Sequence, residues 1–588
     1  EIDTKRVEAY LADAARTWSD RLHEALTMQK GEEEGIELHQ RYKRAFPIAY
    51  AERYSANNAL FDVAHVERVL ATGSLVIDLF RHRKQDHREF HIKIIHAGAP
   101  VPLSEIMPRL ENMGLRVQSE VPYEVHPSGA KEPIRIRDFS LSAEGIQDDL
   151  SSVREKFQEA FIRVWKREME DDGFNLLILR AEMEWHEVVI LRAYSRYLRQ
   201  IGVNLSETTI QRTLANNPEI ARLLIKLFMN NFDPAIGGDS PRGIGLGSPK
   251  VTGRHLAGAA IQSQIEEALN DVSNPDEDRV LRLYVNLIDA TVRTNYFQRT
   301  PAGERKAYLS FKLDSQAVKD LPLPRPLCEI FVYAPTMEGI HLRGGKVARG
   351  GIRWSDRRED FRTEILGLMK AQNVKNVVIV PMGSKGGFVV KNPSSDRAAY
   401  QKEGIESYKT LLRGLLDITD NLRGDEVIRP KDVVRRDGDD PYLVVAADKG
   451  TATFSDIANS VSAEYGFWLG DAYASGGSAG YDHKVMGITA RGGWEAVKRH
   501  FRELGTDIQS EEFTCVGIGD MSGDVFGNAM ILSPMTKLIA AFNHVHIFVD
   551  PDPDPATSFA ERKRMFDQRL GWSGYNTALL SPGGAVFE

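Results

Sequence analysis

Apolar residues recur at three- and four-residue steps over two long parts of the chain, residues 7–70 and 151–296. This spacing is typical of amphipathic helices. Between these parts, in residues 74–141, the pattern changes to the short apolar runs of β-strands. After the proline-rich segment 321–326, glycines, lysines and β-branched runs dominate. The chain is therefore predicted to be a multidomain α/β protein with helical regions before a catalytic α/β region.

Residues 71–145 show the pattern of a small α/β domain. Two predicted strands, 75–80 and 90–95, precede a helix that is expected to begin with Ser104 as its N-cap and to end at Gly114. A third predicted strand follows the helix. This order resembles a regulatory ACT domain, although any ferredoxin-like fold gives the same pattern.

Composition excludes several classes of protein. A net charge of −8 over 588 residues does not favour nucleic acid as a partner, and no apolar run reaches the length of a membrane span. Two cysteines are too few for a disulfide framework or a cysteine zinc site, and they favour the cytoplasm. The chain starts without Met, so we expect a piece of a longer polypeptide.

Four histidines between residues 82 and 96 are the main candidates for a metal site. The spacing of His87 and His91 would suit a metal only on a helix, and here it falls on a predicted loop and strand. We therefore expect a solvated hairpin and no bound metal.

The chemistry is predicted to lie in three segments, and the first contains paired glycines between two arginines. Gly350 and Gly351 would let a ligand approach the backbone closely, while Arg349 and Arg353 would flank it with positive charge. An anionic substrate requires such a site. A tight turn with solvated charges is the alternative.

The second segment places Lys385 among glycines, in a predicted loop after a buried strand at 377–380. An ammonium group held near Lys370, Lys375 or Arg353 and partly removed from water would have a lowered pKa. Such a lysine can act as a base or polarise a carbonyl group near neutral pH. The spacing does not fit a phosphate-binding P-loop, and a solvated lysine on a flexible turn is the alternative.

The third segment is a predicted strand, 443–447, that ends at Asp448. Open α/β sheets build their sites at the carboxyl ends of strands, which favours a functional carboxylate. Capping of the following helix is the alternative role.

A glycine turn downstream has features of a dinucleotide-binding turn. Gly517 and Gly519 follow a predicted strand and precede a predicted helix at 525–532, so that the turn with Asp520 and Met521 would meet the pyrophosphate. The negative charge of Asp520 near a phosphate weakens this interpretation.

Asp550 ends another predicted strand, 546–549, and its carboxylate would suit the ribose hydroxyls of NAD. The interval from Gly519 to Asp550 is longer than the usual ~20 residues, which also weakens the assignment.

Four longer motifs resemble the large NAD-specific glutamate dehydrogenases of bacteria. They are residues 349–364, 370–388, 446–456 and 476–492. In that family, ACT-like and helical regions precede the dehydrogenase core and the subunits are longer than this chain. The resemblance implies a helical scaffold at 1–70, an ACT-like domain at 71–145, a helical domain at 146–300, a catalytic domain at 301–488 and an incomplete Rossmann NAD-binding domain at 489–588.

The resemblance also assigns roles to single residues. It makes Lys385 the catalytic lysine and Asp448 the catalytic aspartate, and it leaves Lys370 and Lys375 as competing ligands of the substrate α-carboxylate. Arg349 takes the place of the family's lysine that binds the distal carboxylate.

Thr489 is expected near the nicotinamide. The implied reaction is NAD-dependent oxidative deamination of L-glutamate to 2-oxoglutarate and ammonium, in a homo-oligomer with an amino-acid effector at the ACT-like domain. The alternatives are a dehydrogenase of another amino acid, against which Arg349 argues, and a catalytically inactive regulatory or assembly fragment.

Overall fold

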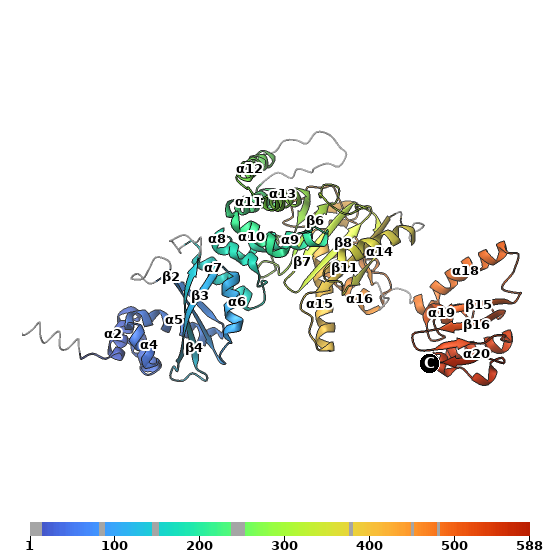
Figure 1. Ribbon diagram of the computed structural model, residues 1–588, viewed down its shortest axis with the longest axis horizontal. Coiled ribbons are helices and arrows are strands. Elements are labelled where there is room, and N and C mark those ends of the chain that lie inside the picture. The colour runs from blue at the N-terminus through green and yellow to red at the C-terminus, as the bar shows by residue number, and fades with distance from the viewer. Residues whose placement is uncertain are drawn as a thin grey trace, which may run out of the picture. The chain divides into compact units, whose positions relative to one another are not determined.

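The computed structural model describes residues 15–81, 89–143, 152–236, 253–375, 380, 382–447, 452–478 and 483–588. The chain divides into two compact units, residues 1–444 and 445–588, and each is described by itself. Figure 1 labels their elements.

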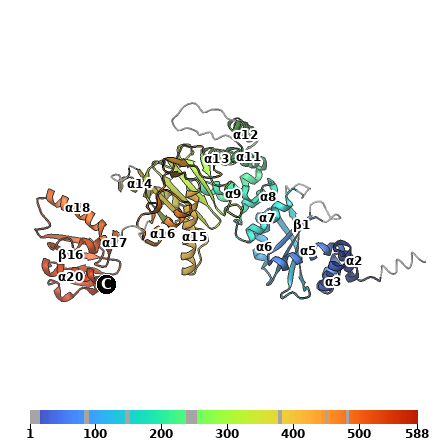
Figure 2. The same cartoon turned by 180° about the vertical axis from the view of Figure 1, so that it is seen from behind.

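The N-terminal part of the first unit packs helices against a four-stranded sheet. Its elements are α2 (Trp18–Lys30), α3 (Glu32–Tyr42), α4 (Ile48–Arg53), α5 (Ala56–Thr72), β1 (Val76–Phe80), β2 (Glu89–Ala97), α6 (Leu103–Asn112), β3 (Leu115–Val125) and β4 (Ile134–Ala143). The strand order is β1-β2-β4-β3, and neighbouring strands are antiparallel. Figures 1 and 2 show this sheet from its two sides.

Both faces of this sheet are buried. Val76 and its partner Ile95 pack with the core of α2–α5, whereas Ile77 and Ile94 pack into the core that contains α6 and the helix after β4. Side chains of a strand alternate between the two faces, which explains this division. The two predicted strands are confirmed.

The predicted N-cap of α6 is wrong, and the predicted end is confirmed. The N-cap is Pro102, so Ser104 lies inside the first turn. The fixed φ of proline suits the extended residue before a helix. Gly114 has a φ of 89°, a left-handed conformation that favours glycine after the last turn.

A helical region follows and joins the small sheet to a larger one. Its elements are α7 (Arg154–Trp165), η1 (Gly173–Asn175), α8 (Leu176–Arg180), α9 (Trp185–Gln200), α10 (Glu207–Asn216), α11 (Pro218–Phe232), α12 (Gly253–Leu269) and α13 (Pro275–Ala290). Helix α9 is the central one: Tyr194 stacks on Phe311 of the larger sheet, with ring centroids 4.2 Å apart. The helices and the larger sheet therefore share one core.

The larger sheet supports the candidate site. Its region contains β5 (Thr291–Thr294), β6 (Leu309–Asp314), β7 (Cys328–Tyr333), β8 (Met337–Arg343), β9 (Ala348–Arg349), β10 (Gly351–Trp354), α14 (Phe361–Lys375), β11 (Met382–Val390), α15 (Arg397–Leu416), β12 (Asn421–Arg423) and β13 (Glu426–Ile428). The strand order within the first unit is β10-β11-β8-β7-β6-β5, and β9 also pairs with β11. Strands β9 and β10 run parallel to β11, and β8 runs antiparallel to it.

Helices α14 and α15 cover opposite faces of this sheet. A Cβ added at Gly387 would meet Ile365 of α14, whereas one added at Gly339 would meet Leu411 of α15. Gly339 pairs with Phe388, the next residue after Gly387, so the two contacts lie on opposite faces.

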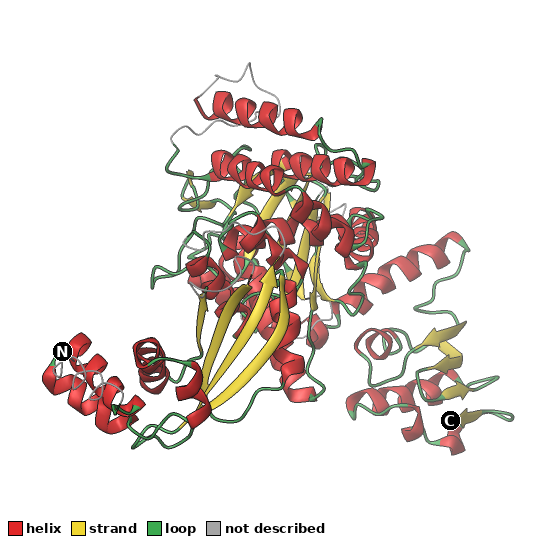
Figure 3. Ribbon diagram, turned by 60° about the vertical axis from the view of Figure 1, so that its left-hand side comes forward, coloured by secondary structure: helices red, strands yellow, loops and turns green. Residues whose placement is uncertain are grey.

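The second unit contains a smaller sheet. Its elements are β14 (Ala446–Ala447), α16 (Ala452–Glu464), η2 (Gly470–Ala472), α17 (His483–Met486), α18 (Ile488–Glu503), β15 (Phe513–Ile518), α19 (Asp524–Ala529), β16 (Thr536–Phe542), β17 (Ile547–Val549), α20 (Pro555–Asp567), η3 (Trp572–Gly574), η4 (Thr577–Leu579) and β18 (Ala585–Phe587). The order is β15-β16-β17-β18, of which only β15 and β16 pair in parallel. Figure 3 shows these strands in yellow near the label C.

Within the described ranges, no helix has both the length and the apolar character needed to cross a membrane.

The packing of Trp354 on α15 gives a test of the larger sheet. A Cβ added at Gly404 would lie 1.9 Å from Cη2 of Trp354. We expect Gly404→Ala to lower the free energy of unfolding by about 1–3 kcal/mol, because the indole ring must move. Hydrogen exchange of the β10 and α15 amides measures this effect.

Gly367→Ala on α14 is the matched control, since nothing lies within 4 Å of its added Cβ. This variant should keep or slightly increase amide protection, because alanine favours a helix over glycine. Equal protection in the two variants would contradict the packing described here.

Candidate functional site

Lys385 lies within strand β11 and is only 2% exposed. The predicted loop at this position is therefore wrong, because residues 382–390 form one continuous strand. The strand predicted at 377–380 falls mainly outside the described residues. Glycines usually weaken strands, which is why the sequence favoured a loop, but they are suited to strands that other backbone elements approach closely.

Helix α14 makes such a close approach on both sides of Lys385. A Cβ added at Gly383 would lie 2.8 Å from the backbone nitrogen of Asn373, and one added at Gly387 would lie 2.3 Å from Cδ1 of Ile365. Alternate residues of a strand share a face, so Lys385 lies on this face between the two glycines. The amide of Gly383 also donates to Oδ1 of Asn373 at 2.5 Å.

The segment from Arg349 to Gly351 lies directly beside this part of β11. Arg349 is paired with Gly383 across the parallel strands. A Cβ added at Gly350 would lie 1.6 Å from the carbonyl oxygen of Ser384, so only glycine fits there. The structure thus brings Arg349, Gly350 and Gly351 next to the segment that contains Lys385.

Arg353 ties strand β10 to helix α14. Its guanidinium group donates to Glu364 at 2.8 Å, and the hydroxyl of Ser355 donates to the same carboxylate at 2.6 Å. Burial alone would raise the pKa of Glu364, but the bonds from Ser355 and Arg353 lower it. Arg353 therefore has a structural partner beside the site.

The two lysines predicted to bind the α-carboxylate both belong to α14. Lys370 is exposed, and Lys375 is the last residue of the helix, with a side chain outside the described part. The choice between them stays open.

A buried ionic anchor that the sequence analysis missed holds the start of α14. Arg362 and Glu329 are both fully buried, and Nε of Arg362 donates to Glu329 at 2.9 Å. Tyr197 of α9 donates to the same carboxylate at 2.9 Å. A lone glutamate within the apolar run of β7 was the sequence signal for a buried partner.

Asp448 lies outside the described residues. Helix α16 begins at Ala452 after it. Of the strand predicted at 443–447, only residues 446–447 form one, β14, and residues 443–445 are buried outside any strand. Thr489 is exposed in the first turn of α18.

The glycine turn after β15 has a packing explanation. A Cβ added at Gly517 would lie 2.3 Å from Cε2 of Phe526, and one at Gly519, whose φ is +135°, would lie 2.8 Å from Cβ of the same residue. Met521 is 1% exposed in the core of the second unit. Partial burial would raise the pKa of Asp520, but hydrogen bonds from Ser522 and from a neighbouring asparagine lower it.

Asp550 lies away from this turn. The amide of Gly519 donates to the carbonyl of Phe542 at the end of β16, whereas the amide of Asp550 donates to Ile539, farther back along the same strand. The carboxylate of Asp550 is buried and accepts hydrogen bonds from the amide and hydroxyl of Ser581. The sequence analysis missed β16, which places an antiparallel strand before Asp550.

Among the described residues, no group of three histidine, cysteine or acidic side chains is arranged to hold a metal ion. His91 is buried, with Nδ1 3.3 Å from Asp138. His96 lies 3.1 Å from the carbonyl of Ala97. His82 and His87 lie outside the described residues.

Comparison with known proteins gives matches over most of the chain. Residues 264–588 match the family described as bacterial NAD-glutamate dehydrogenase, catalytic domain. Residues 169–234, 74–153 and 25–69 match helical motif 3, the ACT3 domain and helical motif 2 of glutamate dehydrogenase.

Three relatives align with all of this chain. The NAD-specific glutamate dehydrogenase of Halomonas elongata is 53% identical over 591 residues. The proteins of that name from Pseudomonas aeruginosa and Mycobacterium tuberculosis are each 47% identical, over 593 and 606 residues. The chain spans 36% of the length of each relative.

The fit of Gly350 against β11 gives a direct test of the site's framework. Gly350→Ala should displace the carbonyl of Ser384 and reduce amide protection in β9, β10 and β11, at a cost of about 1–3 kcal/mol. Gly438→Ala is the control, because its added Cβ meets only the end of the Lys346 side chain at 3.8 Å. Unchanged exchange in β11 of the Gly350 variant would contradict this geometry.

Because of His341, we expect the stability of the same sheet to depend on pH. It is paired with Gly386, and burial and Arg343 lower its pKa from 6.5 to about 3. The unfolded chain therefore binds a proton that the folded chain does not, and stability falls as the pH falls below 6.5.

Between pH 7 and pH 5, this histidine should cost about 2 kcal/mol of local stability. Hydrogen exchange of β8, corrected for the intrinsic pH dependence of exchange, should show a smaller loss in His341→Gln than in the unmodified chain. Equal losses would show that His341 is not responsible.

Proposed function

Because the chain belongs to the bacterial NAD-glutamate dehydrogenase family, we propose that it carries the catalytic core of an enzyme that oxidises L-glutamate to 2-oxoglutarate and ammonium. The observation that carries the proposal is the buried Lys385, held between two glycines under α14 and beside the Arg349 segment. One buried amine and a neighbouring guanidinium group suit an anionic substrate with a reacting nitrogen or carbonyl centre.

The substrate's charges match the cations near β11. Glutamate carries two carboxylates, and we assign Arg349 to the distal one and Lys370 or Lys375 to the α-carboxylate. An arginine at the distal position can form two parallel hydrogen bonds to a carboxylate. Arg353 is already paired with Glu364, so its role in the proposal is to position β10 and α14.

The chain's own residues then move protons. Asp448 takes a proton from the substrate amino group as the Cα–H bond breaks. Bound NAD⁺ would supply the acceptor for the hydride that leaves Cα. Lys385 activates the water that adds to the resulting imine and stabilises the carbinolamine, which collapses to 2-oxoglutarate and ammonium.

The second unit fits a dinucleotide in part. The β15–α19–β16 sequence gives a parallel strand pair with a glycine turn at the carboxyl end of the first strand. We propose that the backbone of Gly517, Gly519, Asp520 and Met521 faces the cofactor, with Thr489 near the nicotinamide. Asp550 is left out of this proposal, because its carboxylate is buried and its Oδ1 accepts hydrogen bonds from the amide and hydroxyl of Ser581.

We also propose a homo-oligomer in the cytoplasm, with an amino-acid effector at the ACT-like sheet. Two free cysteines and no disulfide between them are consistent with a reducing compartment.

Replacement of Lys385 tests the reaction in the complete protein. Lys385→Met should lower glutamate turnover by about 10²- to 10⁴-fold, because general acid–base catalysis is lost. Binding of NAD⁺, measured by calorimetry, should stay unchanged and would show that the variant folds.

Lys402→Met, which replaces an exposed lysine of α15, is the matched control and should keep full turnover. Full turnover in the Lys385 variant would remove this lysine from the mechanism.

A further inference from the structure

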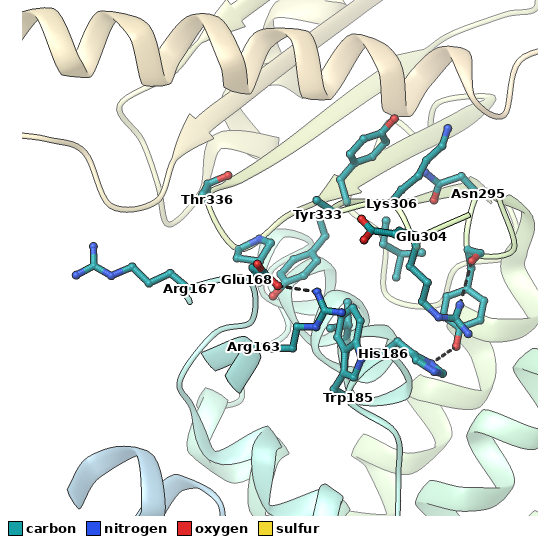
Figure 4. Close-up of a pocket in the computed structure, with 17 residues that line it drawn as sticks. Arg163, Arg167, Glu168, Trp185, His186, Asn295, Glu304, Lys306, Tyr333 and Thr336 are labelled. Carbon is teal, nitrogen blue, oxygen red and sulfur yellow. Dashed lines mark hydrogen bonds and ion pairs between the residues drawn. The ribbon is translucent and has the colours of Figure 1, made fainter. Parts of the chain in front are cut away.

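A cavity of about 380 Å³ lies in the first unit, between the helical region and the loops of the larger sheet. Its walls come from the end of α7, the start of α9, the connection between β5 and β6, and the turn between β7 and β8. Figure 4 shows side chains from these segments around one space, with Arg167 extending away from the others. The volume is that of a small-molecule site.

This cavity is separate from the proposed catalytic lysine. Lys385 pairs with Leu342 near the end of β8, whereas the cavity is lined by Thr336, just before that strand begins. Five residues of extended strand separate Met337 from Leu342, a distance of roughly 17 Å. A molecule in the cavity would therefore not touch the Lys385 side chain.

The walls of the cavity are held in place by buried hydrogen bonds. Tyr333 donates to Glu170, whose carboxylate also pairs with Lys391 at 3.0 Å. On another wall, Nδ1 of His186 lies 2.6 Å from the hydroxyl of Tyr296. The site is thus largely formed before any ligand binds, which lowers the entropic cost of binding.

Aromatic rings form much of the lining. Trp185, Tyr296, Tyr308 and Tyr333 all face this space, together with the ring of His186. Burial, with Arg305 and Arg299, lowers the pKa of His186 to about 3, so that its ring is neutral at pH 7. These walls favour a planar, apolar body over a fully polar one.

Positive charge exceeds negative charge in the lining, where four cations face two carboxylates. Arg163 pairs with Glu168 at 2.6 Å, and Lys306 pairs with Asp417 outside the lining. Arg305 differs from these two, because no ion pair engages it within the described residues.

The Arg305 guanidinium lies 4.6 Å from the centre of the Tyr296 ring, and among the described residues its one hydrogen bond is a long one of 3.4 Å to the carbonyl of Tyr296. Burial and the neighbouring Arg299 lower its pKa, although the group stays protonated at pH 7. A half-buried cation of this kind is stabilised by an anion.

We propose that this cavity binds a small aromatic anion, whose ring packs among Trp185 and the tyrosines and whose carboxylate or phosphate group pairs with Arg305. Glu304 is exposed at the rim of the cavity. Its negative charge would repel a second anionic group of the ligand that lay near this glutamate. Binding here does not depend on the dehydrogenase activity, so the two can fail separately.

Calorimetry on this full chain tests the proposal with three probes of similar size. The probes are 3-phenylpropionate, phenyl phosphate and the uncharged 3-phenylpropan-1-ol. One of the two anions should bind with a stoichiometry of one, and the tighter of them identifies the anionic group. Binding of neither anion, or equal binding of the alcohol, would overturn the proposal.

Variants of the lining arginines test whether the anion binds at Arg305. Arg305→Met should weaken the anion by about 10- to 100-fold, as expected for loss of a hydrogen bond to a charged group. Arg305→Lys should restore part of the affinity, and Arg167→Met, at the exposed rim, should leave it unchanged. If a folded Arg305→Met variant binds the anion as tightly as the unmodified chain, the anion binds elsewhere. The same follows if Arg167→Met loses as much affinity as Arg305→Met.

Discussion

The close contact between helix α14 and strand β11 is the constraint on which the candidate site depends. Glycines at positions 383 and 387 let the helix lie almost against the strand backbone, and Lys385 is buried between them. A larger residue at Gly383 would clash with the backbone of α14, and one at Gly387 would displace the side chain of Ile365. Burial bears on the proposed role of this lysine, because removal from bulk water favours the uncharged form of an amine, which can accept a proton.

Helix α14 is held in this position by buried charge. Arg362 and Glu329 contribute little net stability as a buried pair, but removal of either would leave an uncompensated charge in the core. The contribution of this ion pair is to fix the position at which α14 begins. Tyr197 connects this anchor to α9, whose opposite end supplies Trp185 and His186 to the aromatic cavity. Twelve residues of helix, roughly 18 Å, separate Trp185 from Tyr197.

The sequence predicted the elements with a strong hydrophobic period and missed those governed by close packing. The strands at 76–80 and 89–97 and the helical region were evident from periodicity. The glycines around Lys385 predict a loop because glycine is common in turns, whereas in the structure they make room for α14. The dinucleotide-binding role of Gly517 and Gly519 stays a prediction, and the structure adds a packing reason for both glycines, because an added Cβ at either would meet Phe526. Glu329 in an apolar strand indicated a buried partner, but the sequence could not identify Arg362 and Tyr197, because they lie on helices far away in the chain.

The most direct measurement of this account is an experimental structure of the complete protein with bound NAD and 2-oxoglutarate. The quantity to measure is the distance from Nζ of Lys385 to the 2-oxo oxygen of the ligand. We expect a hydrogen-bond distance of about 3 Å. A ligand that binds elsewhere, with Lys385 still buried and out of reach under α14, would contradict it.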